Sequence, residues 1–224
     1  MQPEYARLLD EALNTEDFFL RNCGAAARSR YPEHFAEAAE AEAAATQIRE
    51  YAPQLIPGLL QTPAYARAVC RAYQPTAQEE VIEELVAARG ERARLLTDPT
   101  EPLLWAVVDE AALRRVTGGR AVMAEALRHI AGLAHRNRVI VQVLTFDAGA
   151  HPAMEGAIKL MDFEDAPPLV YFEGPGIGRL EDDPATVHRH RLTYDLLTAG
   201  ALAPENSLAL IDAVAQDYAH EEQP

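Results

Sequence analysis

The sequence predicts an α+β fold in which a helical N-terminal half packs on a C-terminal half with a mixed sheet. Apolar residues recur at helical spacing through the first hundred residues. From Leu103 onwards, short apolar runs bounded by Gly, Pro or charged residues alternate with helical patterns. The chain has 224 residues, 49% of them hydrophobic, which is enough for a substantial core. We therefore expect a helical region, 1–100, and an α/β region, 101–224, within one continuous globular unit.

Breaks in the apolar pattern place the helices of the first region. We expect helices over residues 5–13, 31–50, 63–73 and 76–96, with a further apolar run at 18–20. Pro57 and Gly58 stop one helix, and Thr62 followed by Pro63 is suited to cap and begin the next. A helix, a packed kink and a second helix are therefore predicted around this break.

The long Ala/Glu-rich helix, expected over residues 31–50, is too rich in alanine to form a deep core. Its acidic side chains are interpreted as a solvated helix surface with alanines packed beneath, rather than as metal ligands: Glu33, Glu37, Glu40 and Glu42.

The α/β region alternates strands with helices. Strands are predicted over residues 103–108, 139–144, 157–163 and 169–172, so the sheet should have about four strands. A helix is predicted over residues 109–116, a break at Gly118 and Gly119, and a second helix from there to about residue 135. A further helix is predicted over residues 184–199, and a last one reaches about residue 219. The glycine-rich stretch 174–178 is interpreted as a turn, because no Lys followed by Ser or Thr accompanies it as in a phosphate-binding loop.

Charge and composition exclude several classes of protein. The formal net charge of -15 repels a phosphate backbone, so direct nucleic acid binding by this chain is not expected. The basic pairs Arg114–Arg115 and Arg189–Arg191 are interpreted as solvated helix surface. No segment has the pattern of a signal peptide or a membrane span, and Cys23 and Cys70 match no metal or redox spacing. We expect a cytoplasmic protein without metal or cofactor.

A series of short motifs runs in order along nearly the whole chain: Glu42 with Ala45, Tyr51, residues 57–62 (PGLLQT), Tyr65 to Arg67, Arg89 with Arg92, Asp109 with Glu110, Gly118 with Gly119, residues 141–144 (VQVL), Gly149 to His151, Tyr171 with Glu173, and Ser207. In this order the motifs resemble the large C-terminal domain of actinobacterial Xre-type regulators. These form an antitoxin-like group that is often encoded beside a small partner protein of unknown function.

The resemblance implies a domain that recognises a small molecule or a small partner protein, and it is compatible with a homodimer. In such regulators a helix-turn-helix comes first, and a leader that residues 5–13 resemble joins it to this domain. Because that leader begins directly after Met1, we expect the DNA-binding module to be missing. Ala126 and Thr145 depart from the family pattern near the strand ends, which leaves the ligand or partner open.

Several polar side chains stand where predicted strands end, and α/β sheets hold their binding sites at such ends. Asp109 and Glu110 follow the first predicted strand, and His151 follows the second. A His and a carboxylate that meet in a dry cleft can act as general acid and base. The catalytic candidates are His151, Glu173 and Tyr171. The ligand-binding candidates are Trp105, Glu110, Arg114, His151, Tyr171 and Glu173.

Structural roles stay open for the same side chains. Asp109 suits the N-cap of its helix, and Glu110 with Arg114 suits an i,i+4 surface pair. His151 can bond backbone within its own loop, and Glu173 can form a structural ion pair.

Three functional hypotheses follow. The first is the ligand- or partner-binding half of an Xre-type regulator. The second is a stand-alone enzyme of specialised metabolism, of cyclase or isomerase type, that reuses the ligand pocket and works by orienting its substrate. The third is an antitoxin-like module that neutralises a partner. The sequence does not decide whether a reaction is catalysed.

Overall fold

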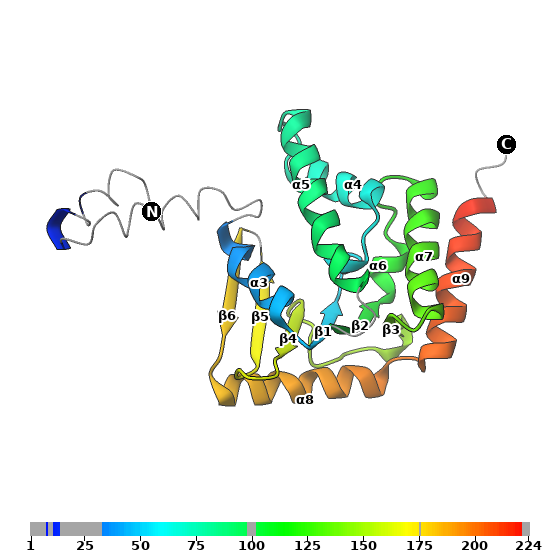
Figure 1. Cartoon of the computed structure of the whole chain (residues 1–224). Helices are drawn as coiled ribbons and strands as arrows, with labels where there is room; N and C mark the ends of the chain where they lie inside the picture. Colours follow the sequence, from blue (N-terminus) through cyan, green and yellow to red (C-terminus); the bar gives the residue numbers. More distant parts are fainter. Residues whose placement is uncertain (1–7, 9–10, 14–32, 98–101, 175, 221–224) are drawn as a thin grey trace.

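The computed structural model describes residues 8, 11–13, 33–97, 102–174 and 176–220, and shows a six-stranded sheet with helices on both faces (Figure 1). The strands are β1 Gln47–Ala52, β2 Leu103–Asp109, β3 Val139–Leu144, β4 Ile158–Asp162, β5 Leu169–Gly174 and β6 Ile177–Glu181. The helices are α3 Glu33–Ala44, α4 Pro63–Tyr73, α5 Glu79–Ala93, α6 Glu110–Arg114, α7 Arg120–His135, α8 Pro184–Gly200 and α9 Pro204–His220. Three short 3-10 turns are η1 Gly58–Leu60, η2 Arg94–Thr97 and η3 Phe146–Ala148.

The sheet is mixed, with the strand order β3-β2-β1-β4-β5-β6. β1, β2 and β3 run parallel to one another, whereas β4 is antiparallel to β1 and is followed by two more antiparallel pairings. β1 is therefore the strand at which the parallel half of the sheet meets the antiparallel half. Its residues pair with β2 on one side and β4 on the other, so that Tyr51 lies between Val107 and Ile158.

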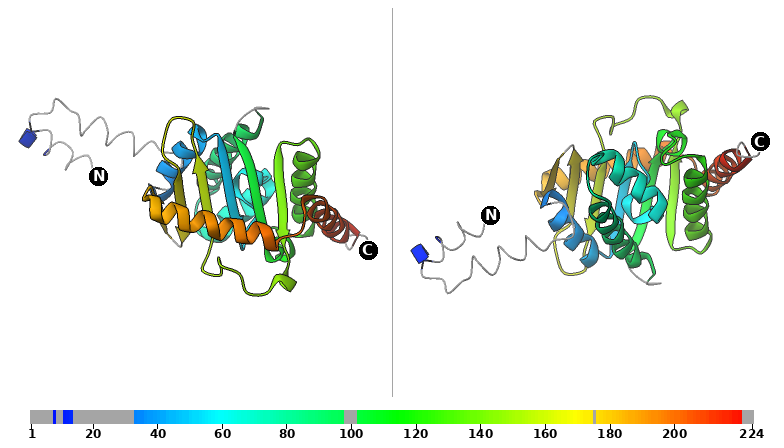
Figure 2. Two further views of the ribbon diagram at one scale, coloured as in Figure 1. Left: turned by 90° about the horizontal axis from the view of Figure 1, so that it is seen from below. Right: turned by 90° about the horizontal axis from the view of Figure 1, so that it is seen from above.

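The helices form unequal layers on the two faces of the sheet (Figure 2). Among the described helices, α8 alone crosses one face, where it contacts β1, β3, β4 and β5. α3, α4, α5 and α7 lie on the opposite face, and α9 packs against α7 and the edge strand β3. The larger core cluster fills the space on the many-helix side, and a smaller cluster that includes Tyr51, Val107 and Tyr194 lies under α8.

The α+β prediction is confirmed, with two corrections to the strands. The sheet has six strands rather than about four. The helix predicted over residues 31–50 ends at Ala44, and the next segment is the central strand β1. The stretch 174–178, interpreted as a turn, does hold a turn at Gly176, and it also contains the end of β5 and the start of β6.

The predicted packed kink is present, but it lies between strand β1 and helix α4 rather than between two helices. Leu59 and Leu60 are fully buried in η1. The Thr62 hydroxyl accepts a hydrogen bond from the Tyr65 N–H, so it caps α4 with Pro63 in the first turn. The Tyr65 hydroxyl in turn accepts the N–H of Ile56 at 3.2 Å, which ties the kink to the helix.

Of the leader predicted over residues 5–13, the structure describes residue 8 and residues 11–13, all of them helical. The rest of that segment, the run at 18–20 and Cys23 lie outside the described residues. Cys70 is buried in α4 as a free thiol. Within the described ranges, no helix is long and apolar enough to cross a membrane.

Candidate functional site

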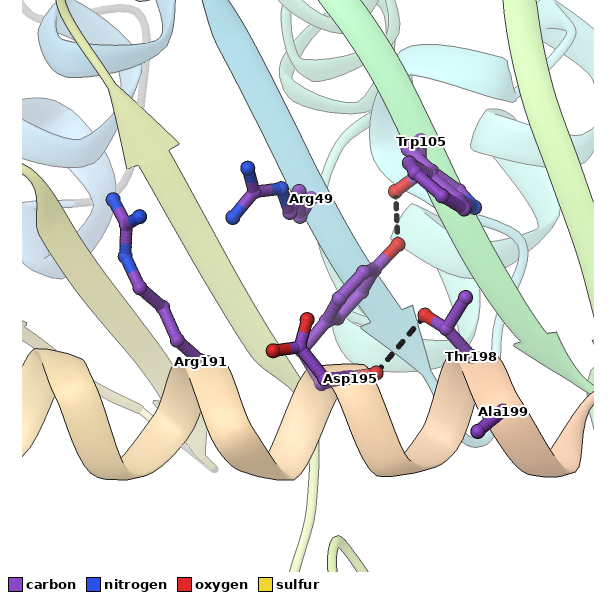
Figure 3. Close-up of a pocket in the computed structure, with 7 residues that line it drawn as sticks. Arg49, Trp105, Arg191, Asp195, Thr198 and Ala199 are labelled. Carbon is purple, nitrogen blue, oxygen red and sulfur yellow. Dashed lines mark hydrogen bonds between the residues drawn. The ribbon is translucent and has the colours of Figure 1, made fainter.

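A cavity of about 500 Å³ lies between α8 and the sheet (Figure 3). Its lining comes from β1, β2 and one side of α8: Arg49, Trp105, Arg191, Tyr194, Asp195, Thr198 and Ala199. The four α8 positions from Arg191 to Thr198 follow the i, i+3, i+4, i+7 spacing of one helix face. Arg49 and Trp105 are paired positions of β1 and β2, so they lie side by side on the face that α8 covers.

Two arginines at this cavity share one carboxylate. Arg191 of α8 bonds the Oδ1 of Asp162, and Nη2 of Arg49 lies 3.5 Å from Oδ2 of the same side chain. Arg49 also donates to the side-chain oxygen of Gln47 at 2.8 Å. Two positive charges therefore meet one negative charge, and a net positive charge remains at this end of the cavity.

Trp105 forms an apolar wall whose polar atom is already satisfied. Its indole N–H donates to Oε1 of Gln142 at 2.9 Å, and the Gln142 amide donates to the backbone oxygen of Leu202. The Tyr194 hydroxyl donates to the Trp105 carbonyl at 2.6 Å. Burial raises the pKa of Tyr194, so this phenol stays a donor. The wall is therefore fixed in position before any ligand binds.

A second group of polar side chains lies at the edge where the parallel strands end. The loop between β3 and β4 starts and finishes at this edge, because β4 runs antiparallel to its neighbour β1. It carries His151 to the ends of β1 and β2. The Tyr51 hydroxyl donates to Oδ2 of Asp109 at 3.1 Å and lies 3.2 Å from Nε2 of His151.

These bonds use both nitrogens of the His151 ring. Its Nδ1 accepts the N–H of Ala153 at 3.3 Å, so Nε2 carries the proton that points to the Tyr51 oxygen. Burial, with Asp109 adding to it, raises the pKa of Tyr51 and keeps its hydroxyl protonated. These linked hydrogen bonds therefore hold the loop between β3 and β4 against the sheet.

The other face of the sheet holds a buried ion cluster. Glu42 of α3 is completely buried; it accepts from Nε and Nη2 of Arg92 at 2.8 and 3.0 Å and pairs with Lys159 of β4. Nζ of Lys159 also lies 3.3 Å from Glu50 of β1. The Arg92 guanidinium lies 4.2 Å from the centroid of the Phe35 ring. The interpretation of Glu42 as a solvated side chain is wrong, because the residue is fully buried and pairs with Arg92 and Lys159.

Burial and pairing oppose each other in the pKa values of this cluster. Burial alone would raise the pKa of Glu42, but Lys159 and Arg92 lower it below the usual range. For Glu50, burial outweighs the attraction of Lys159 and raises the pKa. For Lys159, burial acts to lower the pKa, yet Glu42 and Glu50 raise it. Lys159 and Glu42 are therefore the charged pair at the centre.

The six predicted ligand-binding residues lie in several places. Trp105 lines the cavity, and His151 lies at the strand ends beside Asp109. Asp109 caps α6 through the N–H of Ala111 at 2.8 Å, and Glu110 pairs with Arg114 at 3.2 Å, as their structural interpretation predicted. Glu110 also accepts the backbone N–H of Phe146 at 3.1 Å.

Tyr171 and Glu173 lie elsewhere. Tyr171 is on the many-helix face, with its ring centroid 5.7 Å from that of Phe35 in an edge-to-face contact. Glu173 is exposed on β5. The sheet separates Tyr171 from Trp105, so the two do not form one site.

The cavity residues that sequence reasoning missed are mainly Arg49, Arg191 and Asp195. The sequence pattern places Arg49 within a long helix, whereas it lies in β1, and the interpretation of Arg191 as solvated helix surface is wrong. Arg191 instead pairs with Asp162 and lines the cavity. The available signal was the spacing of Arg191, Asp195 and Thr198 on one face of a helix that was predicted correctly.

In the part of the chain that the structure describes, no group of three or more His, Cys, Asp or Glu side chains could hold a metal ion.

The fold and cavity describe an α+β domain with a pocket of small-molecule size. The family model of DUF5753, a domain of unknown function, matches residues 35–213. The chain therefore belongs to the DUF5753 family. The match covers the sheet, the ion cluster and the cavity lining. No curated protein and no solved structure matched the chain.

Proposed function

We propose that this chain is the ligand-binding domain of an Xre-type regulator and that it takes up a small molecule in the cavity beneath α8. The observation that carries the proposal is the cavity itself. Its volume of about 500 Å³ is within the range of small-molecule sites, roughly 300–1,000 Å³. It combines an aromatic wall with charged groups that can fix the orientation of a bound molecule.

The regulator part of the proposal is supported by the ordered motifs that resemble the Xre-type domain. Several of these motif residues hold the walls around the cavity rather than line it. Gln142 positions Trp105 and also reaches Leu202. Ser207 accepts the N–H of Val143 at 2.9 Å and donates to the Leu202 carbonyl. These bonds join β2, β3, α9 and the segment between α8 and α9 around one end of the site.

The test uses the single tryptophan of the chain as a probe of the cavity. A library of small metabolites is screened for compounds that change Trp105 fluorescence and raise the melting temperature, since binding to the folded state stabilises it. At least one compound should do both. Ala199→Phe, which fills the cavity, should abolish both effects, and the control Ala121→Phe on the exposed face of α7 should preserve them. A screen without such a compound, or equal binding by Ala199→Phe, would overturn the proposal.

A small partner protein is the second candidate ligand, and one observation favours it. The outer side of α8 exposes Leu192 and Leu196, one helical turn apart, at 56% and 52% of their surface. If a partner docks there, Leu192→Asp should abolish its co-purification with this chain. Ala199→Phe should leave co-purification intact, which separates the two candidates.

A further inference from the structure

The positive end of the cavity has unused hydrogen-bond donors. Each guanidinium carries five N–H groups. Arg49 uses one of them on Gln47, and its ion pair with Asp162 is long at 3.5 Å. Both arginines keep part of the side chain exposed, 22% for Arg49 and 34% for Arg191. A ligand carboxylate can therefore be bound here by planar donors from two sides.

The negative group of the cavity is Asp195, one turn beyond Arg191 on the same face of α8. An Arg and an Asp at this spacing can pair across one turn. Here Arg191 turns to Asp162 instead, and Asp195 makes no hydrogen bond or ion pair with any described residue. Figure 3 shows its carboxylate on the cavity side of α8, between Arg191 and Trp105. It is the unpaired charge of the site.

The wall opposite these charges is apolar. The indole N–H of Trp105 is bonded to Gln142, so the ring offers its carbon face rather than a donor. A flat or aliphatic group can pack there while charged groups of the same molecule reach the arginines and Asp195.

We infer that the ligand is an amino-acid-like zwitterion, with a carboxylate bound by Arg49 and Arg191, an ammonium group bound by Asp195, and an apolar side chain packed on Trp105. This inference rests on the proposed function and specifies the chemistry of the same cavity. A ligand with one charge leaves either the arginine pair or Asp195 without its partner. The site therefore selects molecules that carry both.

Three probes with the same phenylethyl skeleton test the inference: L-phenylalanine, 3-phenylpropionate and phenethylamine. Titration followed by Trp105 fluorescence should give L-phenylalanine an affinity about tenfold higher than that of either singly charged probe, the effect of one charged hydrogen bond. In Asp195→Asn, the affinity for L-phenylalanine should fall about tenfold and that for 3-phenylpropionate should stay unchanged. Because Asp195 is exposed and has no partner, this variant should fold normally.

Equal binding of 3-phenylpropionate and L-phenylalanine would overturn the inference, and so would an unchanged ratio in Asp195→Asn. In both cases the cavity still binds a small molecule, so the proposed function stands. Binding by none of the three probes would also overturn the inference, and the metabolite screen would then decide the proposed function separately.

Discussion

Glu42 is a fully buried acid whose partners come from two other elements, Arg92 of α5 and Lys159 of β4. Glu40 lies two positions earlier on the same helix and is exposed. No local property of the sequence separates the two, because both stand in the same Ala/Glu repeat. Only the packing of α3 on the sheet decides which acid is buried. The burial of Glu42 could therefore not be predicted from the sequence.

Glu42→Gln should lower the free energy of unfolding by about 3–5 kcal/mol, because it removes the negative charge that holds two buried cations. Urea unfolding at pH 7 measures the change. Glu40→Gln on the exposed face is the matched control and should stay within about 0.5 kcal/mol of the parent. A loss for Glu42→Gln no greater than that of the control would contradict the ion-cluster account.

Glu50→Gln should change how stability depends on pH. Because burial raises the pKa of Glu50 in the folded state, folding disfavours its charged form. The group contributes stability below the pKa of the unfolded state, and this contribution is lost as pH rises through the higher folded pKa. The variant should therefore exceed the parent in stability near pH 8, with the advantage shrinking as pH falls towards 4.5. Urea unfolding across this range gives the difference.

Comparing variant with parent removes most of the opposite effect of the lowered pKa of Glu42 on stability, since that effect is present in both proteins. A difference that stays constant over the whole pH range would show that the titration of Glu50 is not linked to folding.

Tyr51→Phe should lower the free energy of unfolding by about 1–3 kcal/mol, because it leaves Asp109 and His151 without the hydroxyl that joins them. Thermal and urea unfolding both report this loss. Tyr73→Phe, at a tyrosine that is 60% exposed, provides the control for removing one phenolic oxygen. If the two variants lose the same small amount, the Asp109–Tyr51–His151 chain does not hold the loop.

At the scale of elements, the pattern of apolar residues placed four strands and most helices, and it missed β1 and β6. The β1 sequence Gln-Ile-Arg-Glu-Tyr-Ala carries two charged residues in its middle and directly follows a strong helical repeat. Arg49 and Glu50 are accommodated in a central strand because Asp162 and Lys159 of β4 are there to pair with them. These partners stand more than a hundred residues later, so no local pattern reveals them.

The turn between α6 and α7 depends on Gly118. Its φ of +74° lies in the left-handed region, and an added Cβ would lie 2.8 Å from the Cβ of Ala68 on α4. Gly118→Ala should therefore lower the free energy of unfolding by at least about 1–2 kcal/mol. Gly90→Ala, inside α5 with open space around the added methyl, should raise it by about 0.5–1 kcal/mol. Chemical denaturation of the two variants shows whether each one lowers or raises the free energy of unfolding. A stabilised Gly118→Ala would contradict the close packing of Gly118 against α4.

At the scale of the whole molecule, the cavity is formed by segments that are far apart in the sequence. Arg49, Trp105 and Arg191 come from β1, β2 and α8, and only the strand order brings them together. The sequence indicates Trp105 as a ligand-binding residue, but it places the predicted site at the strand ends, where Asp109 and His151 lie. The crossing of α8 over the middle of the sheet could not be derived from helix and strand predictions alone.

The net charge of -15 leads to a prediction for the intact chain. It should not retain duplex DNA at physiological salt, because it has no excess of cations to release the counterions of the phosphate backbone. A gel-shift series from 50 to about 150 mM salt, with a basic DNA-binding protein as positive control, tests this expectation. Sequence-specific retention that weakens as salt rises would refute it.

The place of β1 in the sheet also governs the order in which the chain can fold during its synthesis. When β1, β2 and β3 have left the ribosome, one edge of β1 is still unpaired, and Glu42 has not met Lys159, which follows 117 residues later. The native sheet closes only after β4 emerges. A nascent chain that stops before that point exposes an open strand edge, so the last third of the protein completes the fold of the first.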